Sequence, residues 1–257
     1  MNKKIALLAS ILLTSTLSFS ASFSINSDSL GLSSVNTGFS PLASSYTQNI
    51  DPATITPANS VQCGAGGLHA DNSYMRRFDL DGDHGVTGSI NIDSVDIGIE
   101  SATGNGGTQP VTVNLYSIAN ADAFLFANLT NIGTLNTNVA DVAAVVQNFI
   151  VTGTINGATD DLVVELFTPD GQVAGHSFFY GSNATGQIAP TFIAAAACAI
   201  TEPTDTAVIG FPDAQIVMVV NASNAALAPP TPVPSLTWLG LALMVLTLGF
   251  FGRRFVK

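Results

Sequence analysis

The chain has 257 residues, only 10% of them charged, and its apolar content is sufficient for a folded core, which excludes a disordered body. Only two of the seven basic residues, Arg76 and Arg77, lie between the hydrophobic ends, whereas all 18 acidic residues lie between Asp28 and Asp213. This acidic middle disfavours nucleic acid and anionic lipid headgroups as ligands. The low content of Lys, Glu and Arg also disfavours a bundle of long helices.

Residues 1–20 have the pattern of a secretory signal peptide. Two lysines precede an apolar stretch over residues 5–17, and small residues then fit a cleavage site before Ala21. An uncleaved membrane anchor is the alternative, but the apolar stretch is shorter than the ~20 residues that span a bilayer. We therefore expect the chain to be exported.

Residues 21–60 are rich in Ser, Thr and Asn with little periodicity, so we expect a loosely ordered lead-in, with room for one edge strand. The clearest strand covers residues 90–100, where apolar and polar residues alternate and the phase slips at Asp93–Ser94, as at a β-bulge. Further short strands are predicted at 111–116, 162–167, 177–180, 191–196 and 216–220.

Turn signals rich in Gly and Asn separate these strands, at 104–107, 156–157, 169–171 and 181–183. Residues 139–149 fit a helix and a strand equally well. Short strands separated in this way predict an all-β domain over residues 61–224, an antiparallel β-sandwich or jelly-roll.

Several motifs of this domain form a recognisable set: Asp71–Tyr74, Arg77–Leu80, Pro110–Tyr116, Gly181–Asn183 and Ile209–Asp213. Together they resemble β-sandwich modules of unassigned function in secreted bacterial proteins. The resemblance implies the sandwich fold and export, and it implies no activity.

Cys63 and Cys198 are the only cysteines, and an even number in an exported chain predicts one disulfide. Asp79, Asp81 and Asp83 stand at alternate positions, like the start of a calcium loop, although His84 takes the place of the EF-hand glycine. The alternative is a tight acidic turn between two strands. Both interpretations stay open, and the first extends to a calcium- or carbohydrate-binding surface module that uses this turn and residues 181–183.

Arg76 and Arg77 are neighbours, so in a strand one faces inward, where we expect an acidic partner. His69, His84 and His176 are too widely spaced for a metal triad, and no G-x-S-x-G nucleophile elbow is present. The sequence therefore gives no reason to expect an enzyme or a cofactor other than calcium.

Residues 225–234 include four prolines and predict a stiff, extended spacer. The next stretch, 235–252, is uncharged and apolar, and a basic cap at 253–257 closes the chain. Because basic flanks stay in the cytoplasm, we expect a transmembrane helix with the domain outside the cytoplasmic membrane. A buried core helix is the alternative, but it leaves the paired arginines of the cap unexplained.

This end of the chain resembles the C-terminal sorting signals that exosortase-type transpeptidases process, in the variety that opens with Ile-Pro-Thr-Leu. The residues that carry the resemblance are Val233, Pro234, Ser235, Leu236, Trp238, Gly240, Arg253 and Arg254. The resemblance implies that the helix is a recognition tag, cut near Pro234, after which the domain passes to a surface carrier or is released.

We therefore expect an exported, membrane-anchored or surface-sorted structural or interaction protein. Its expected partners are a sorting transpeptidase, the membrane, and a surface glycan or protein ligand at the cell surface or in the extracellular matrix.

Overall fold

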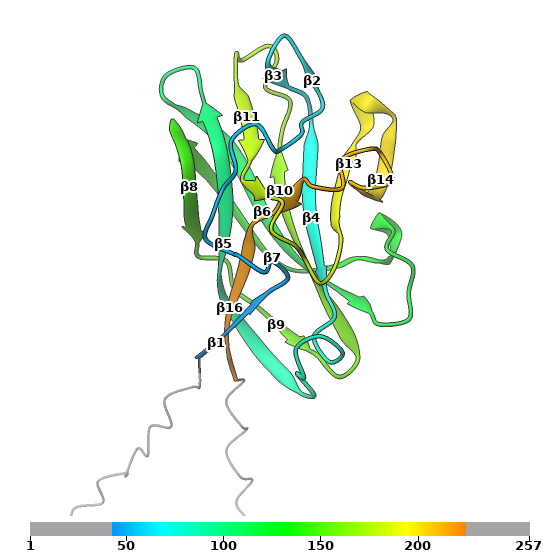
Figure 1. Cartoon of the computed structure of the whole chain (residues 1–257). Helices are drawn as coiled ribbons and strands as arrows, with labels where there is room; N and C mark the ends of the chain where they lie inside the picture. The colour runs from blue at the N-terminus through cyan, green and yellow to red at the C-terminus, as the bar shows by residue number, and fades with distance from the viewer. Residues whose placement is uncertain (1–42, 225–257) are drawn as a thin grey trace, which may run out of the picture. The chain divides into compact units, whose positions relative to one another are not determined.

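The computed structural model describes residues 43–224, and these form an all-β domain with two six-stranded antiparallel sheets (Figure 1). Within that range, no helix is long and apolar enough to cross a membrane. The expected signal peptide, proline-rich spacer, transmembrane helix and basic cap all lie outside the described residues, as do all eight residues of the sorting motif.

The first sheet is organised around one long strand, β5 (Ser89–Thr103). Strands β16 (Met218–Asn224) and β11 (Ser177–Tyr180) pair with one side of β5, end to end. On its other side, β9 (Gly153–Asn156) and β8 (Val142–Phe149) follow one another in the same way. Strand β1 (Ala43–Thr47) adds an outer strand next to β16.

The second sheet has the strand order β14-β13-β4-β10-β6-β7. The strands span β4 Asn72–Phe78, β6 Thr108–Ala119, β7 Thr130–Ala140, β10 Asp160–Thr168, β13 Thr191–Ala195 and β14 Ile200–Asp205. Smaller elements complete the fold: β2 Gly64–Ala65 with β3 Leu68–His69, β12 Ser182–Asn183 with β15 Gln215–Ile216, and the 3₁₀ turns η1 Phe126–Asn128 and η2 Ala196–Cys198.

The core lies between the two sheets, because inward-facing residues of both belong to one buried cluster. Alternate residues of β5, Val95, Ile97 and Ile99, are fully buried there against residues of β6, β4 and β10. This face-to-face packing makes the domain an antiparallel β-sandwich. The expected bulge in β5 is confirmed: Ser94 pairs with Asn221 and Ile92 with Ala222, which leaves Asp93 as the extra residue.

At three places the structure decides between the expected alternatives or departs from the sequence prediction. The sandwich includes β1 and so extends back at least to Ala43, not only to residue 61. Residues 139–149 are no helix, since they hold the end of β7 and all of β8, which belong to different sheets. The expected turn at 181–183 is instead strand β12, where Ser182 and Asn183 are fully buried.

Both described ends of the chain lie at the same end of the sandwich. Ala43 in β1 pairs with Ser223 in β16, so the chain enters and leaves side by side (Figure 1). The opposite end carries the hairpin of β2 and β3 and the tight turn between β5 and β6. In that turn Gly106 and Gly107 adopt φ values of +87° and +84°, which glycine reaches without steric cost.

Candidate functional site

The predicted disulfide between Cys63 and Cys198 is present and joins residues 135 positions apart. It lies at the end of the sandwich away from the described chain ends, beside a buried polar group. His69 Nε2 lies 3.0 Å from Gln109 Oε1, and the Gln109 amide donates to the Ser177 carbonyl. These contacts tie the β2–β3 hairpin to both sheets.

The three aspartates of the suspected calcium loop lie in a turn that is closed by its own backbone. Asp79 Oδ1 accepts a 2.7 Å hydrogen bond from the Gly82 amide, and the Asp83 and Gly85 amides donate to the carbonyls of Asp79 and Asp81. Within residues 43–224 no group of three His, Cys, Asp or Glu side chains is arranged to hold a metal ion. The geometry is that of an acidic Asx-type turn, in which one oxygen of the Asp79 carboxylate accepts a backbone hydrogen bond.

His84 packs this turn against the sandwich. Its ring centroid lies 5.3 Å from that of Tyr46 in β1 and 6.0 Å from that of Phe78 in β4. Burial disfavours the charged imidazolium and lowers the pKa of His84, although the nearby carboxylates of Asp83 and Asp79 oppose the shift. His84 is therefore a packing residue whose charge state is coupled to folding.

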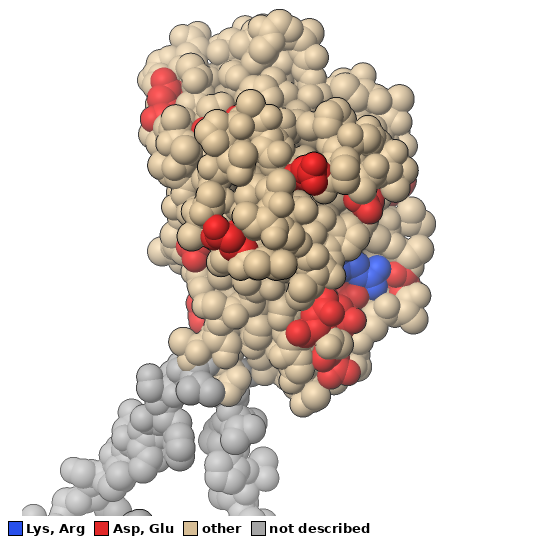
Figure 2. All heavy atoms as spheres, viewed as in Figure 1, with Lys and Arg blue, Asp and Glu red and all other residues tan. Residues whose placement is uncertain are grey.

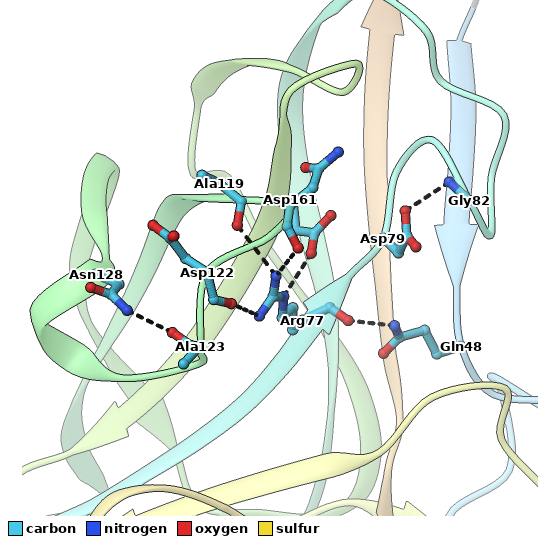
Figure 3. A network of polar contacts seen from close by, with 10 residues as sticks. Gln48, Arg77, Asp79, Gly82, Ala119, Asp122, Ala123, Asn128 and Asp161 are labelled. Carbon is cyan, nitrogen blue, oxygen red and sulfur yellow. Dashed lines mark hydrogen bonds and ion pairs between the residues drawn. The ribbon is translucent and has the colours of Figure 1, made fainter.

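Arg77 is the centre of a network of polar contacts (Figure 3). Its Nε donates to Asp161 Oδ2 at 2.6 Å, and its terminal nitrogens donate to the carbonyls of Ala119, Asn120 and Asp122. These bonds clamp the loop that follows β6 onto β4 and β10. Because its nitrogens already donate to these acceptors, the guanidinium holds this loop in place and has little capacity left for an anionic ligand.

Within residues 43–224, this network holds the only basic side chain that reaches the surface. Figure 2 shows a single basic patch next to acidic ones, and it must be Arg77 because Arg76 is fully buried. Burial is the largest influence on Asp161 and raises its pKa, while Arg77 lowers it and the nearby Asp79 and Asp160 raise it further. The second oxygen of Asp161, Oδ1, is buried and has no hydrogen-bond partner.

Arg76 is the inward-facing arginine, and its surroundings differ from the prediction. No carboxylate of residues 43–224 lies within 4.0 Å of its guanidinium. It donates instead to the Ile216 carbonyl at 2.6 and 3.2 Å, the Ala189 carbonyl at 2.8 Å and Gln187 Oε1 at 2.9 Å. Burial lowers the pKa of Arg76 to about 9, which leaves the group charged at neutral pH. The positive charge of Arg76 is therefore stabilised by carbonyl dipoles and not by a carboxylate.

The outer faces of both sheets carry ladders of amides and hydroxyls in place of charged pairs. On the second sheet, Thr134 donates to Asn114, and Asn114 and Tyr116 both donate to Glu165 Oε2, at 2.9 and 2.8 Å. Burial and the Glu165 charge raise the pKa of Tyr116, so its hydroxyl stays a donor.

On the first sheet, a similar ladder runs from β1 to β8. Ser45 donates to Asn221, and Asn221 and Asn148 both donate to Asp96. Each ladder thus ends on one carboxylate: both oxygens of Asp96 accept hydrogen bonds, and Oε2 of Glu165 accepts two. The faces offer neutral hydrogen-bonding groups to a partner, and they hold no cluster of free charges.

Several shallow hollows open on the described surface, including the following two. One of about 200 Å³ lies by Phe126 and Phe167, with Asp71, Ser73 and Thr201 at its rim. The other, of about 630 Å³, lies at the β5 bulge and is lined by Asn91, Ile92, Asp93, Ile132, Thr152, Gly153 and Thr154. The second matches small-ligand sites in size, and its side chains can hydrogen-bond a neutral polar group but provide no nucleophile paired with a base.

The structure separates the residues that the sequence analysis grouped together. The two loops of the suspected glycan site do not form one surface, because Ser182 and Asn183 are buried whereas Asp81 and Asp83 are exposed. Sequence reasoning missed the Glu165 ladder, since its members come from three strands and show only as isolated polar residues in apolar runs.

Comparisons with known proteins assign this chain to no group. No family model, no curated protein and no solved structure matches it.

Proposed function

We propose that the chain is an exported protein, sorted to the cell surface through its C-terminal tag, whose β-sandwich is a structural or interaction module. The observation that carries the proposal is the order at the C-terminus: the Val233–Leu236 motif, an apolar stretch and the Arg253–Arg254 pair. Each part is common, but the three in this order are typical of a sorting signal.

Two features of the described domain support export and display. The Cys63–Cys198 disulfide suits an oxidising compartment outside the cytoplasm. The pairing of Ala43 with Ser223 sends both ends of the chain from one end of the sandwich. A domain held there by its C-terminal spacer presents the disulfide-bonded end to its surroundings.

The structural or interaction role is supported by the kind of groups that the domain presents. Its outer faces carry ladders of amides and hydroxyls, and the one ion pair among residues 43–224, Arg77 with Asp161, clamps a loop onto the sandwich. Such surfaces suit contact with neutral polymers or proteins better than chemistry on a bound substrate.

The test follows the full chain in a host that carries a sorting transpeptidase. We expect Pro234→Ala to keep the protein in the membrane fraction with its tag, and the wild-type chain to reach the cell surface or the medium. Pro232→Ala is the matched control, because it changes a proline of the same spacer outside the motif, and it should be sorted normally. Equal sorting of both variants contradicts the proposal.

A further inference from the structure

Edge strands decide how a sandwich meets other chains, because their outer backbone groups are free to pair. The described sheets have edges at β1, β14, β7, and the line of β8 and β9. Strand β14 is protected in the usual way, since it holds Pro203 and the acidic residues Glu202 and Asp205. Strands β1, β7 and β8 hold neither charge nor proline, and of these only β8 carries an exposed large apolar side chain.

Strand β8 reads Val-Ala-Ala-Val-Val-Gln-Asn-Phe, with neither charge nor proline. Among residues 43–224 it pairs only with β5, so its outer edge is free, and it forms the left border of the domain in Figure 1. Ala144 interrupts its regularity with a φ of +51°, which leaves Val145–Phe149 as the continuous edge. Five residues are a common strand length.

Exposed aliphatic side chains accompany this free edge. Val146 in β8 is 40% exposed, and Ile150, directly after the strand, is 73% exposed. The other large exposed apolar side chains of the described domain lie outside the main strands, in loops and turns. Strand β8 therefore joins unpaired backbone groups with apolar surface, a combination typical of strand-addition interfaces.

Charge indicates which partner fits. The described domain holds all acidic residues except Asp28 and only two basic ones, so two copies repel each other over most of their surfaces. From residue 142 to 159 the chain has no charged residue. Residues 123–140, which hold the edge strand β7, are equally uncharged, but of the two strands only β8 adds an exposed large apolar side chain to this low electrostatic cost. A basic partner would gain nothing here, because the strand offers no carboxylate to pair with.

We propose that β8 is the docking edge for a second copy of this chain, paired antiparallel with the same strand of its partner about a two-fold axis. Antiparallel pairing of identical strands is self-complementary, so one surface serves both copies. The two first sheets then form one continuous sheet across the dimer. The interface removes an unprotected edge and covers Val146 and Ile150.

The experiment is sedimentation velocity on the full chain in a mild detergent, over about 1–100 µM protein, since a dimer of this kind dissociates on dilution. We expect a reversible dimer. Raising NaCl from about 50 to 500 mM should strengthen it, because salt screens the repulsion between acidic copies. A chain that stays monomeric at all concentrations and salt levels overturns the proposal.

Val146→Asp places like charges across the two-fold axis and should weaken the dimer about tenfold or more. Val173→Asp is the matched control, because Val173 is fully exposed in the loop before β11, which pairs with the side of β5 opposite to β8, and it should leave the dimer unchanged. If Val146→Asp lowers the melting temperature, its effect on the dimer could come from a destabilised monomer. The dimer is then tested with Ile150→Asp, since that side chain is largely exposed in the monomer. Dimers that withstand both β8-edge substitutions, or that Val173→Asp weakens equally, rule out this edge.

Discussion

Replacement of the buried Arg76 gives the strongest test of how the domain is held together. The guanidinium connects β4 to two distant segments through the carbonyls of Ala189 and Ile216 and the side chain of Gln187. Arg76→Ala leaves two main-chain carbonyls without this donor, at about 1–3 kcal/mol each. It also leaves a cavity, whereas the desolvation penalty of the charge disappears. We expect a net loss of about 3–5 kcal/mol in the free energy of unfolding.

Arg76→Met separates the two contributions, because it keeps most of the side-chain volume and removes every hydrogen bond. We expect it to be about 1–2 kcal/mol less destabilising than Arg76→Ala. The assay is equilibrium unfolding in urea, followed by circular dichroism on the oxidised protein, with the slope of each transition compared. A Met variant as stable as the wild type would refute the reasoning, since the carbonyl bonds would then only offset the cost of burying the charge.

Three further predictions concern the turn and the disulfide. Replacing both Cys63 and Cys198 with Ser should lower the free energy of unfolding by roughly 5 kcal/mol, because the bond closes a loop of 135 residues, and comparison of urea midpoints checks this. The lowered pKa of His84 means that the unfolded chain takes up a proton more readily than the folded one. The stability of the folded state should therefore fall as the pH is lowered from about 7 to 5. The melting temperature of His84→Phe should fall less than that of the wild type over that range. Millimolar calcium should leave the melting temperature unchanged, since Asp79 Oδ1 already accepts a hydrogen bond from the Gly82 amide. A rise of several degrees would support calcium binding at this turn.

Features with a local pattern could be predicted from the sequence. The strict alternation in β5 placed its buried face, and the phase slip at Asp93–Ser94 placed its bulge. The disulfide was predictable because two cysteines allow only one pairing within the chain. In each case neighbouring residues, or a unique pair, carried the information.

Features that depend on distant partners could not be predicted. Strand β1 is polar and lacks an apolar alternation, and it becomes a strand because β16, more than 170 residues later, pairs with it. Alternation did indicate that one of the two arginines is buried. Its acceptors, however, are backbone carbonyls 113 and 140 residues away in the chain. Every residue has such a carbonyl, so the sequence does not show which ones accept.

The stretch 139–149 was ambiguous for a related reason. Asp141 accepts a hydrogen bond from the Gly104 amide and marks the point where the chain passes from one sheet to the other. The period of the apolar residues breaks at this crossing, so the segment matched neither a helix nor a single strand.

The mass of the mature C-terminus tests the central claim most directly. The protein isolated from the surface or the medium of a host with a sorting transpeptidase is digested, and its last peptide is identified by mass spectrometry. Sorting predicts a chain that ends near Pro234, with Leu236–Lys257 removed. A surface or released product that still carries Arg253 and Arg254 would contradict it.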